Sequence, residues 1–135
     1  MAKPERMTFF KATIADTPGA FLAMAKELKA KNIGLLGCSG FDSRPGQAEV
    51  FVIPKKPEKL RNLWKTSGTA FEEGTGFLVK GTDETGALIT TLETLARVGI
   101  NIRASNAVAV GGKYGALLWV AQQDVEKTAA ALGVK

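Results

Sequence analysis

The sequence predicts an α+β fold that consists of two copies of one βαββαβ unit. The first observation is an internal repeat: "IADTPGAFLAMAKELKAKNIGLLG", from Ile14, aligns without a gap on "GTDETGALITTLETLARVGINIRA", from Gly81. The second is that strand-like and helix-like hydrophobic patterns recur in the same order in both halves. The third is length, because 135 residues allow two very small units that support each other's cores.

The first half begins with a predicted strand and a turn. Residues 7–14, "MTFFKATI", are rich in aromatic and β-branched residues, which is typical of a strand. In the turn that follows, Asp16 or Thr17 can cap the next helix, Pro18 suits its first turn, and Gly19 allows a tight bend.

An amphipathic helix follows this turn. Apolar side chains recur at helical spacing and lysines occupy the other face, so we expect the apolar stripe to lie on a sheet. The stripe is Phe21, Leu22, Ala25 and Leu28. The rest of the half is predicted as strands at 32–41 and 48–54, a helix at 56–65 and a short strand at 69–73.

The second half repeats this order. We expect a strand at 76–82, a helix whose stripe is Leu88, Ile89, Leu92 and Leu95, strands at 100–110 and 114–121, and a helix at 124–132. The last strand is short or missing, and the sheet edge it leaves open favours dimerisation. The expected domains are 1–73 and 74–135. Each unit is a ferredoxin-like sandwich, with an antiparallel sheet and both helices on one face.

Composition excludes several classes of function. The chain has no histidine and one cysteine, Cys38, so a zinc site or a nucleophile paired with histidine cannot be assembled. We therefore expect no enzyme, no catalytic residue, no metal and no cofactor. The sequence also shows neither a secretion signal nor an apolar run of membrane-spanning length, and we expect a cytoplasmic protein without a membrane partner. The net charge of +5 comes from the first half, where it serves solubility or attracts nucleic acid or an acidic partner.

The D-x-P-G turn before an amphipathic helix, followed by "KNIGLLG" or "GINIRA", resembles the ACT domain. The resemblance covers residues 7–73 and 76–134. ACT domains are ferredoxin-like ligand-sensing modules that usually bind amino acids and pair side by side. The resemblance implies an amino-acid ligand at the interface between paired units, against the turn between the first strand and the first helix. The matching positions are Asp16, Thr17, Pro18, Gly19 and Ala20 in the first unit, and Asp83, Glu84, Thr85, Gly86, Ala87 and Asn101 in the second.

The physical chemistry of the turn suits such a ligand. Unpaired amides at a helix N-terminus attract a carboxylate, a glycine lets the backbone approach closely, and a nearby aspartate can receive an ammonium group. The chain departs from the family's pattern in three respects. Ile14 and Gly81 stand where some members place a histidine, aspartate replaces a common asparagine, and Glu84 adds a further charge, so the two turns are not expected to be equivalent.

Simpler interpretations of these residues remain open. Asp16 and Asp83 can be helix caps, Gly19 and Gly86 can serve turn geometry alone, and Asn101 can satisfy backbone groups at a strand end. We interpret Cys38, Trp64 and Trp119 as packing residues. The residues "KKPEK" at 55–59 are interpreted as a solvated helix start and "GGK" at 111–113 as a hairpin turn.

Three functions are compatible with the sequence. The leading hypothesis is a non-catalytic regulatory protein that binds an amino acid, forms a homodimer and acts on an unidentified protein partner. A second is a structural or regulatory subunit without a ligand. The third, an RNA-binding ferredoxin-like module, is disfavoured because the predicted strands offer only Phe41 and Phe51 for base stacking.

Overall fold

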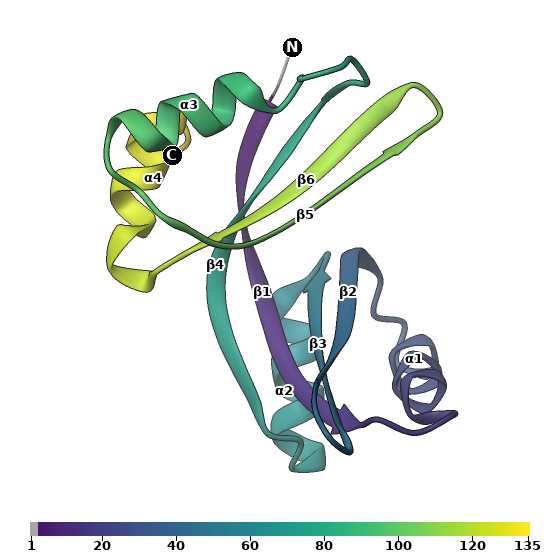
Figure 1. Ribbon diagram of the computed structural model, residues 1–135. Helices are drawn as coiled ribbons and strands as arrows, with labels where there is room; N and C mark the ends of the chain where they lie inside the picture. The colour runs from purple at the N-terminus through teal and green to yellow at the C-terminus, as the bar shows by residue number, and fades with distance from the viewer. Residues whose placement is uncertain (1–2) are drawn as a thin grey trace. The chain divides into compact units, whose positions relative to one another are not determined.

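The structure is a computed structural model that describes residues 3–135 (Figure 1). Its strands and helices alternate in the order that the sequence predicts. The elements are β1 (Lys3–Ala15), α1 (Ala20–Ala30), β2 (Leu35–Arg44), β3 (Gln47–Pro54), α2 (Pro57–Ser67), β4 (Phe71–Thr82), α3 (Ile89–Arg97), β5 (Ile102–Val110), β6 (Lys113–Val120), the short 3₁₀ helix η1 (Gln122–Asp124) and α4 (Val125–Leu132).

The fold is α+β, as predicted, with a six-stranded antiparallel sheet and βαββαβ-type units. The strand order is β2-β3-β1-β4-β6-β5. The chain divides into two compact units, which we call the first unit (Thr8–Gly74) and the second unit (residues 3–7 and 75–135). Strands β1 and β4 therefore each contribute residues to both units. In the second unit, residues 3–7 stand in for the last strand that its own half of the sequence lacks.

Each unit has its own hydrophobic core. In the first unit, residues from α1 and α2 pack on one face of the strands, which places both helices on the same side. The largest fully buried side chains there are Phe10, Leu60 and Trp64. The second unit repeats this arrangement with Phe77, Leu95 and Leu118. Because the backbone alternates, neighbouring residues on these strands face away from the cores.

The structure confirms the internal repeat at the level of backbone hydrogen bonds. The first helix of each unit is followed, two residues after its last residue, by a residue with positive φ, Asn32 (55°) in one unit and Gly99 (76°) in the other. The next amide then bonds back into the helix, from Ile33 to the Leu28 carbonyl and from Ile100 to the Leu95 carbonyl, at 2.9 Å in both cases. Strands β3 and β6 also share one burial pattern along their lengths.

Strand β4 is longer than the sequence suggested. The two short strands expected at 69–73 and 76–82 form one continuous strand, because Gly74 and Gly76 are extended and make no turn. A Cβ at Gly74 would lie 2.7 Å from Cζ of Phe9, so the glycine is needed for close packing. This strand glycine thus lies where the Phe9 side chain packs against the backbone.

The helix stripes predicted from the sequence are partly wrong. In α1 the buried residues are Met24 and Leu28, whereas Phe21 and Leu22 are about half exposed (52% and 57%). The second unit shows the same departure. Its buried positions are Thr91 and Leu95, and the exposed apolar residues there are Ile89 and Leu92. Each helix is therefore turned so that part of its apolar surface is not covered by its own sheet.

Candidate functional site

The two D-x-x-G turns have matching geometry in the structure. The amide of Asp16 donates to the Gly46 carbonyl (3.1 Å), and the amide of Asp83 donates to the Gly112 carbonyl (3.0 Å). Gly46 and Gly112 lie in the hairpins that join β2 to β3 and β5 to β6. Each turn is therefore held against the hairpin of its own unit.

Both turns need glycine for their backbone conformation. Gly19 (φ 90°) and Gly86 (φ 77°) lie in the left-handed region, where a side chain would be strained. Amides one residue later bond back across the turn, from Ala20 to the Thr17 carbonyl (3.2 Å) and from Ala87 to the Glu84 carbonyl (2.9 Å). The turn-geometry interpretation of the two glycines is therefore confirmed, and it leaves room for a ligand role as well.

The aspartates do not cap the helices. The N-cap residue of α1 is Gly19 and that of α3 is Leu88, and neither helix start has a side-chain cap hydrogen bond. The cap interpretation of Asp16, Thr17 and Asp83 is therefore wrong. The first turns of α1 and α3 also contain no acidic residue, so the positive end of each helix dipole is not neutralised from within the helix.

A hollow of about 290 Å³ lies beside the second turn. Four of the predicted site residues line it, whereas Thr85 and Asn101 are not among its lining residues. Its wall also includes apolar residues that the sequence argument missed, from α3 and β5. The predicted lining residues are Asp83, Glu84, Gly86 and Ala87, and the additional ones are Leu88, Ile89, Leu92, Ala107, Val108, Ala109 and Tyr114.

The first turn is as exposed as the second. Asp16, Thr17, Pro18 and Gly19 are exposed, and Ala20 is half-buried. A hollow of about 420 Å³ in this unit lies between α1 and the start of β2, and none of the five turn residues lines it. In the second unit, the acidic turn and an apolar hollow therefore lie together.

Cys38 borders that larger hollow of the first unit. Partial burial raises the pKa of the Cys38 thiol, so the neutral, weakly nucleophilic form predominates at neutral pH. Within residues 3–135, no group of three or more His, Cys, Asp or Glu side chains could hold a metal ion. No described helix has both the length and the apolar character needed to cross a membrane.

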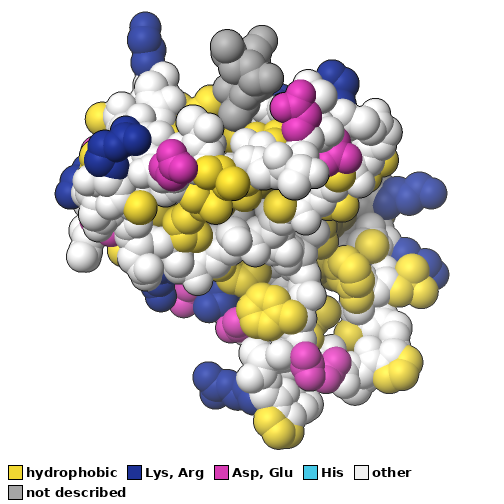
Figure 2. Space-filling model, turned by 45° about the horizontal axis from the view of Figure 1, so that its top comes forward, with side chains coloured by type: hydrophobic (Ala, Val, Ile, Leu, Met, Phe, Trp, Pro, Cys, Tyr) yellow, Lys and Arg dark blue, Asp and Glu magenta, His cyan; other side chains and the backbone are white. Residues whose placement is uncertain are grey.

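Exposed apolar side chains occur at equivalent positions of the two units. Leu22 and Ile89 match each other in the repeat, as do Phe41 on β2 and Val108 on β5, and all four are at least half exposed. Figure 2 shows hydrophobic side chains on the surface between scattered charged ones. The sequence contains this signal, because the repeat aligns the four residues in two pairs. The helix stripes that include Leu22 and Ile89, however, are predicted to be core.

Aromatic rings also gather on neighbouring strands of the first unit. Phe51 on β3 lies 5.9 Å from Phe9 and 6.1 Å from Phe41 between ring centroids. Lys11 lies over the Phe51 ring, but its ammonium pairs with Glu49 (3.3 Å) and Glu72 (4.0 Å). The sequence pattern indicated Phe41 and Phe51 as rings available for stacking, but not Phe9. The carboxylates beside these rings disfavour a nucleic-acid backbone at this place.

Comparison with solved structures shows what fold this is. A protein from Bacteroides thetaiotaomicron, BT0572, matches with a TM-score of 0.82 at 16% identity, over 95% of this chain and 87% of that one. The ligand-free regulatory subunit of aspartate kinase from Thermus thermophilus matches with a TM-score of 0.64 at 13% identity, over 98% and 94%.

A longer protein, the allosteric aspartate kinase of Clostridium acetobutylicum, matches with a TM-score of 0.57 at 13% identity. The match covers 97% of this chain and 33% of that one, so this chain corresponds to about a third of that kinase. No protein-family model matches the sequence, and no curated protein matches it significantly. The comparisons therefore establish the fold.

Proposed function

We propose that this protein is a non-catalytic regulatory protein that binds an amino acid beside its acidic turns, at an interface between paired ACT units. The observation that carries the proposal is the combination found in the second unit. An exposed acidic turn, an uncapped helix N-terminus and an apolar hollow meet there, next to apolar side chains that no described residue buries.

The chemistry of the hollow fits the two ends of an α-amino acid. The carboxylates of Asp83 and Glu84 attract an ammonium group, and the amides at the start of α3 offer donors to a carboxylate. The aliphatic side chains of Ile89 and Leu92 favour a small or aliphatic ligand side chain. Asp16, at the matching position of the first unit, would provide a second site.

Pairing of units is supported by the repeated exposed apolar residues. Exposed apolar side chains are ordinary when they are single, but a patch that recurs at equivalent positions indicates an interaction surface. Ile89 and Val108 line one hollow of the second unit, and Leu22 and Phe41 are the exposed apolar residues at the equivalent positions of the first unit. A homodimer would cover them and would close the hollow beside the second turn. The regulatory subunits and allosteric kinase that share this fold support a regulatory role.

A thermal-shift screen against the twenty amino acids tests the proposal. A ligand that binds only the folded state raises the melting temperature by mass action. We expect one amino acid to do so at millimolar concentration, and Asp83→Ala to abolish the shift. Asp42→Ala, which removes an exposed carboxylate of β2, is the matched control. A flat response to all twenty amino acids would leave the protein a structural or regulatory subunit without this ligand.

A further inference from the structure

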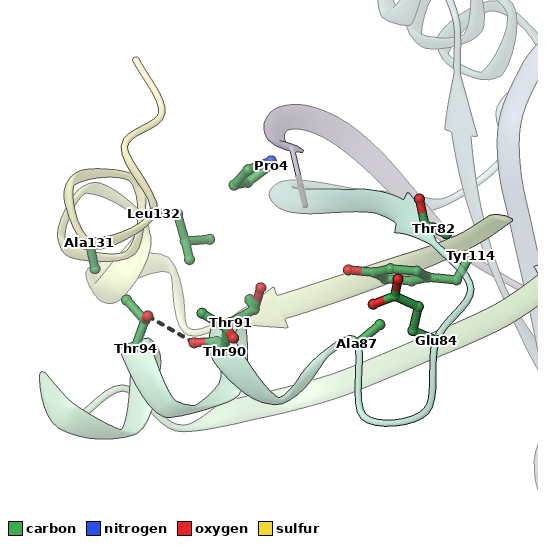
Figure 3. Close-up of a pocket in the computed structure, with 10 residues that line it drawn as sticks. All are labelled: Pro4, Thr82, Glu84, Ala87, Thr90, Thr91, Thr94, Tyr114, Ala131 and Leu132. Carbon is green, nitrogen blue, oxygen red and sulfur yellow. Dashed lines mark hydrogen bonds between the residues drawn. The ribbon is translucent and has the colours of Figure 1, made fainter. Parts of the chain in front are cut away.

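A second cavity, of about 370 Å³, lies in the second unit between α3, α4 and the strands (Figure 3). It adjoins the hollow beside the turn, because Glu84, Ala87 and Tyr114 border both, but neither Asp83 nor Gly86 lines it. Its wall is rich in hydroxyl groups, which come from Tyr114 and four threonines. Leu132 of α4 supplies an aliphatic side.

The Tyr114 hydroxyl is the most informative group in this cavity. Figure 3 shows it pointing toward Thr90 and Thr91 of α3. The oxygen is buried, and it has no hydrogen-bond partner among the described residues. A buried hydroxyl without a partner is rare, since its desolvation costs about 1–3 kcal/mol. Thr91, only 6% exposed, is a second buried polar side chain in the same wall.

The first unit joins its two helices by a side-chain hydrogen bond. The amide of Thr69 bonds to the Trp64 carbonyl (3.0 Å) and that of Val134 to the Ala129 carbonyl (2.8 Å), so Trp64 and Ala129 occupy the same position relative to their helix ends. The Trp64 indole Nε1 donates to the Glu27 carboxylate of α1 at 3.3 Å.

Glu27 matches Thr94 in the repeat, and Thr94 lines the cavity. Its hydroxyl bonds only within α3, to the Thr90 carbonyl at 2.9 Å. Ala129 has no polar side-chain atom, so it makes no equivalent hydrogen bond to α3. It is buried in the core and does not line the cavity, and α3 and α4 pack directly on each other.

We propose that this cavity is a binding site for a small hydroxylated amine, a class that includes amino alcohols and amino sugars. The Glu84 carboxylate favours an ammonium group, and no Lys or Arg is among the lining residues to hold an anion. The threonine hydroxyls and Tyr114 pair with ligand hydroxyls. The volume falls within the range of small-molecule sites, about 300–1,000 Å³.

Three sugars of similar size and different charge test the ligand class. Glucosamine is cationic, glucose is neutral and gluconate is anionic, and each is titrated into the full chain by isothermal calorimetry with saturation-transfer NMR as a second readout. We expect glucosamine to bind best and gluconate not to bind. The preference for glucosamine over glucose should disappear in Glu84→Gln.

Two variants locate the binding. Thr91→Val keeps the shape of the side chain, and Tyr114→Phe removes only the unpartnered oxygen, so each should weaken glucosamine binding about two- to tenfold. Thr66→Val, at an exposed threonine of α2, is the matched control and should leave the affinity unchanged. The melting temperature of unliganded Tyr114→Phe should not fall, because the hydroxyl has no partner among the described residues.

The proposal is overturned by either of two results. One is that none of the three sugars binds at about 10 mM, a concentration that detects even millimolar affinity; the cavity then holds water. The other is binding that Thr91→Val and Tyr114→Phe leave unchanged, which would place the ligand elsewhere. Neither result bears on the amino-acid screen, whose diagnostic variant is Asp83→Ala.

Discussion

The indole Nε1 of Trp64 donates a hydrogen bond to the carboxylate of Glu27, at 3.3 Å, and so joins α2 to α1 in the first unit. The ring is 1% exposed and lies within 6.1 Å of Phe10 and 5.8 Å of Phe71 between centroids. Ala129 takes this position in the second unit. The two copies of the repeat thus join their helices differently, through the Trp64 indole in the first unit and by direct packing of α3 on α4 in the second.

Replacing Trp64 should strongly destabilise the protein. Trp64→Ala removes a buried ring and a bond between helices, and we expect the free energy of unfolding to fall by about 3–5 kcal/mol. Guanidinium denaturation followed by circular dichroism measures this loss. Lys65→Ala, at an exposed neighbour on the same helix, should change it by less than about 0.5 kcal/mol. A loss below about 1 kcal/mol for Trp64→Ala would mean that the ring is not a core residue.

Two strand glycines should respond differently to the same substitution. In Gly74→Ala the new Cβ would lie 2.7 Å from the Phe9 ring, whereas in Gly115→Ala the new Cβ would have no atom within 4 Å beyond its chain neighbours. We therefore expect Gly74→Ala to destabilise by about 1–3 kcal/mol and Gly115→Ala to be close to neutral. Thermal unfolding of the two variants in parallel provides the comparison. Equal melting temperatures would contradict the close contact.

Acid should weaken one ion pair of the first unit. Two hydrogen bonds from the Arg61 guanidinium, one of them 2.9 Å long, hold the pKa of Glu73 below its ordinary value. Because the folded-state pKa is lowered, the stabilisation is present above the unfolded pKa, near 4.5, and is lost as pH falls through the folded value.

Unfolding measured between neutral pH and pH 3 tests this expectation. Both side chains are about a third exposed, so we expect the contribution to stay below about 1 kcal/mol. In Glu73→Gln this part of the acid sensitivity should be absent, whereas Glu93→Gln, at an exposed position of α3, should retain it. If the unfolding profiles of the unaltered protein, Glu73→Gln and Glu93→Gln coincide over this pH range, the ion pair does not contribute to stability.

Charge on the repeated apolar patch should separate the proposed dimer. Leu22→Asp and Ile89→Asp each place a carboxylate where we propose contact with a second copy, and burying it there without a partner is costly. We expect each variant to lower the molar mass measured by light scattering from that of a dimer toward that of a monomer. Ala130→Asp, at an exposed position of α4, should leave the molar mass unchanged. A monomeric unaltered protein at all concentrations would refute the pairing.

Nucleic acid should not bind specifically. Filter binding of single-stranded RNA at low and moderate salt is the measurement, because phosphate contacts weaken steeply as salt rises. We expect only weak binding that disappears with salt and is unchanged in Phe41→Ala. Tight, salt-resistant binding that Phe41→Ala abolishes would favour the RNA-binding alternative, with the row of rings on Phe9, Phe51 and Phe41 as its surface.

Much of the fold could be predicted because the signals are local. Turn residues and hydrophobic spacing placed the helices, and the spacing from Asp16 to Asp83 indicated the repeat. The starts and ends of the strands were harder to predict. Gly74 and Gly76 looked like a break, but they are positions where other groups approach an extended chain. The prediction that the aspartates cap the helices was wrong, because the N-cap residues are Gly19 and Leu88, further along the chain.

The candidate site was predictable only in part. The second turn does border a hollow, but the apolar wall of that hollow comes from β5 and from side chains such as Ile89 that the sequence pattern places in the core. The cavity with the Tyr114 hydroxyl had no sequence signal of its own. Its wall is formed by residues far apart in the sequence, from Pro4 to Leu132, which only the tertiary structure brings together.

By itself the sequence determined the α+β class, the repeated unit and the position of both acidic turns, because each depends on residues close together in the chain. The tertiary structure alone decided which face of α1 and α3 is covered, which strand completes the second unit, and which residues form the cavity beside Tyr114. These features depend on which side chains meet across the unit. Hydrophobic periodicity along one helix shows only that the helix has an apolar face. How much of that face is buried depends on packing against residues distant in the sequence.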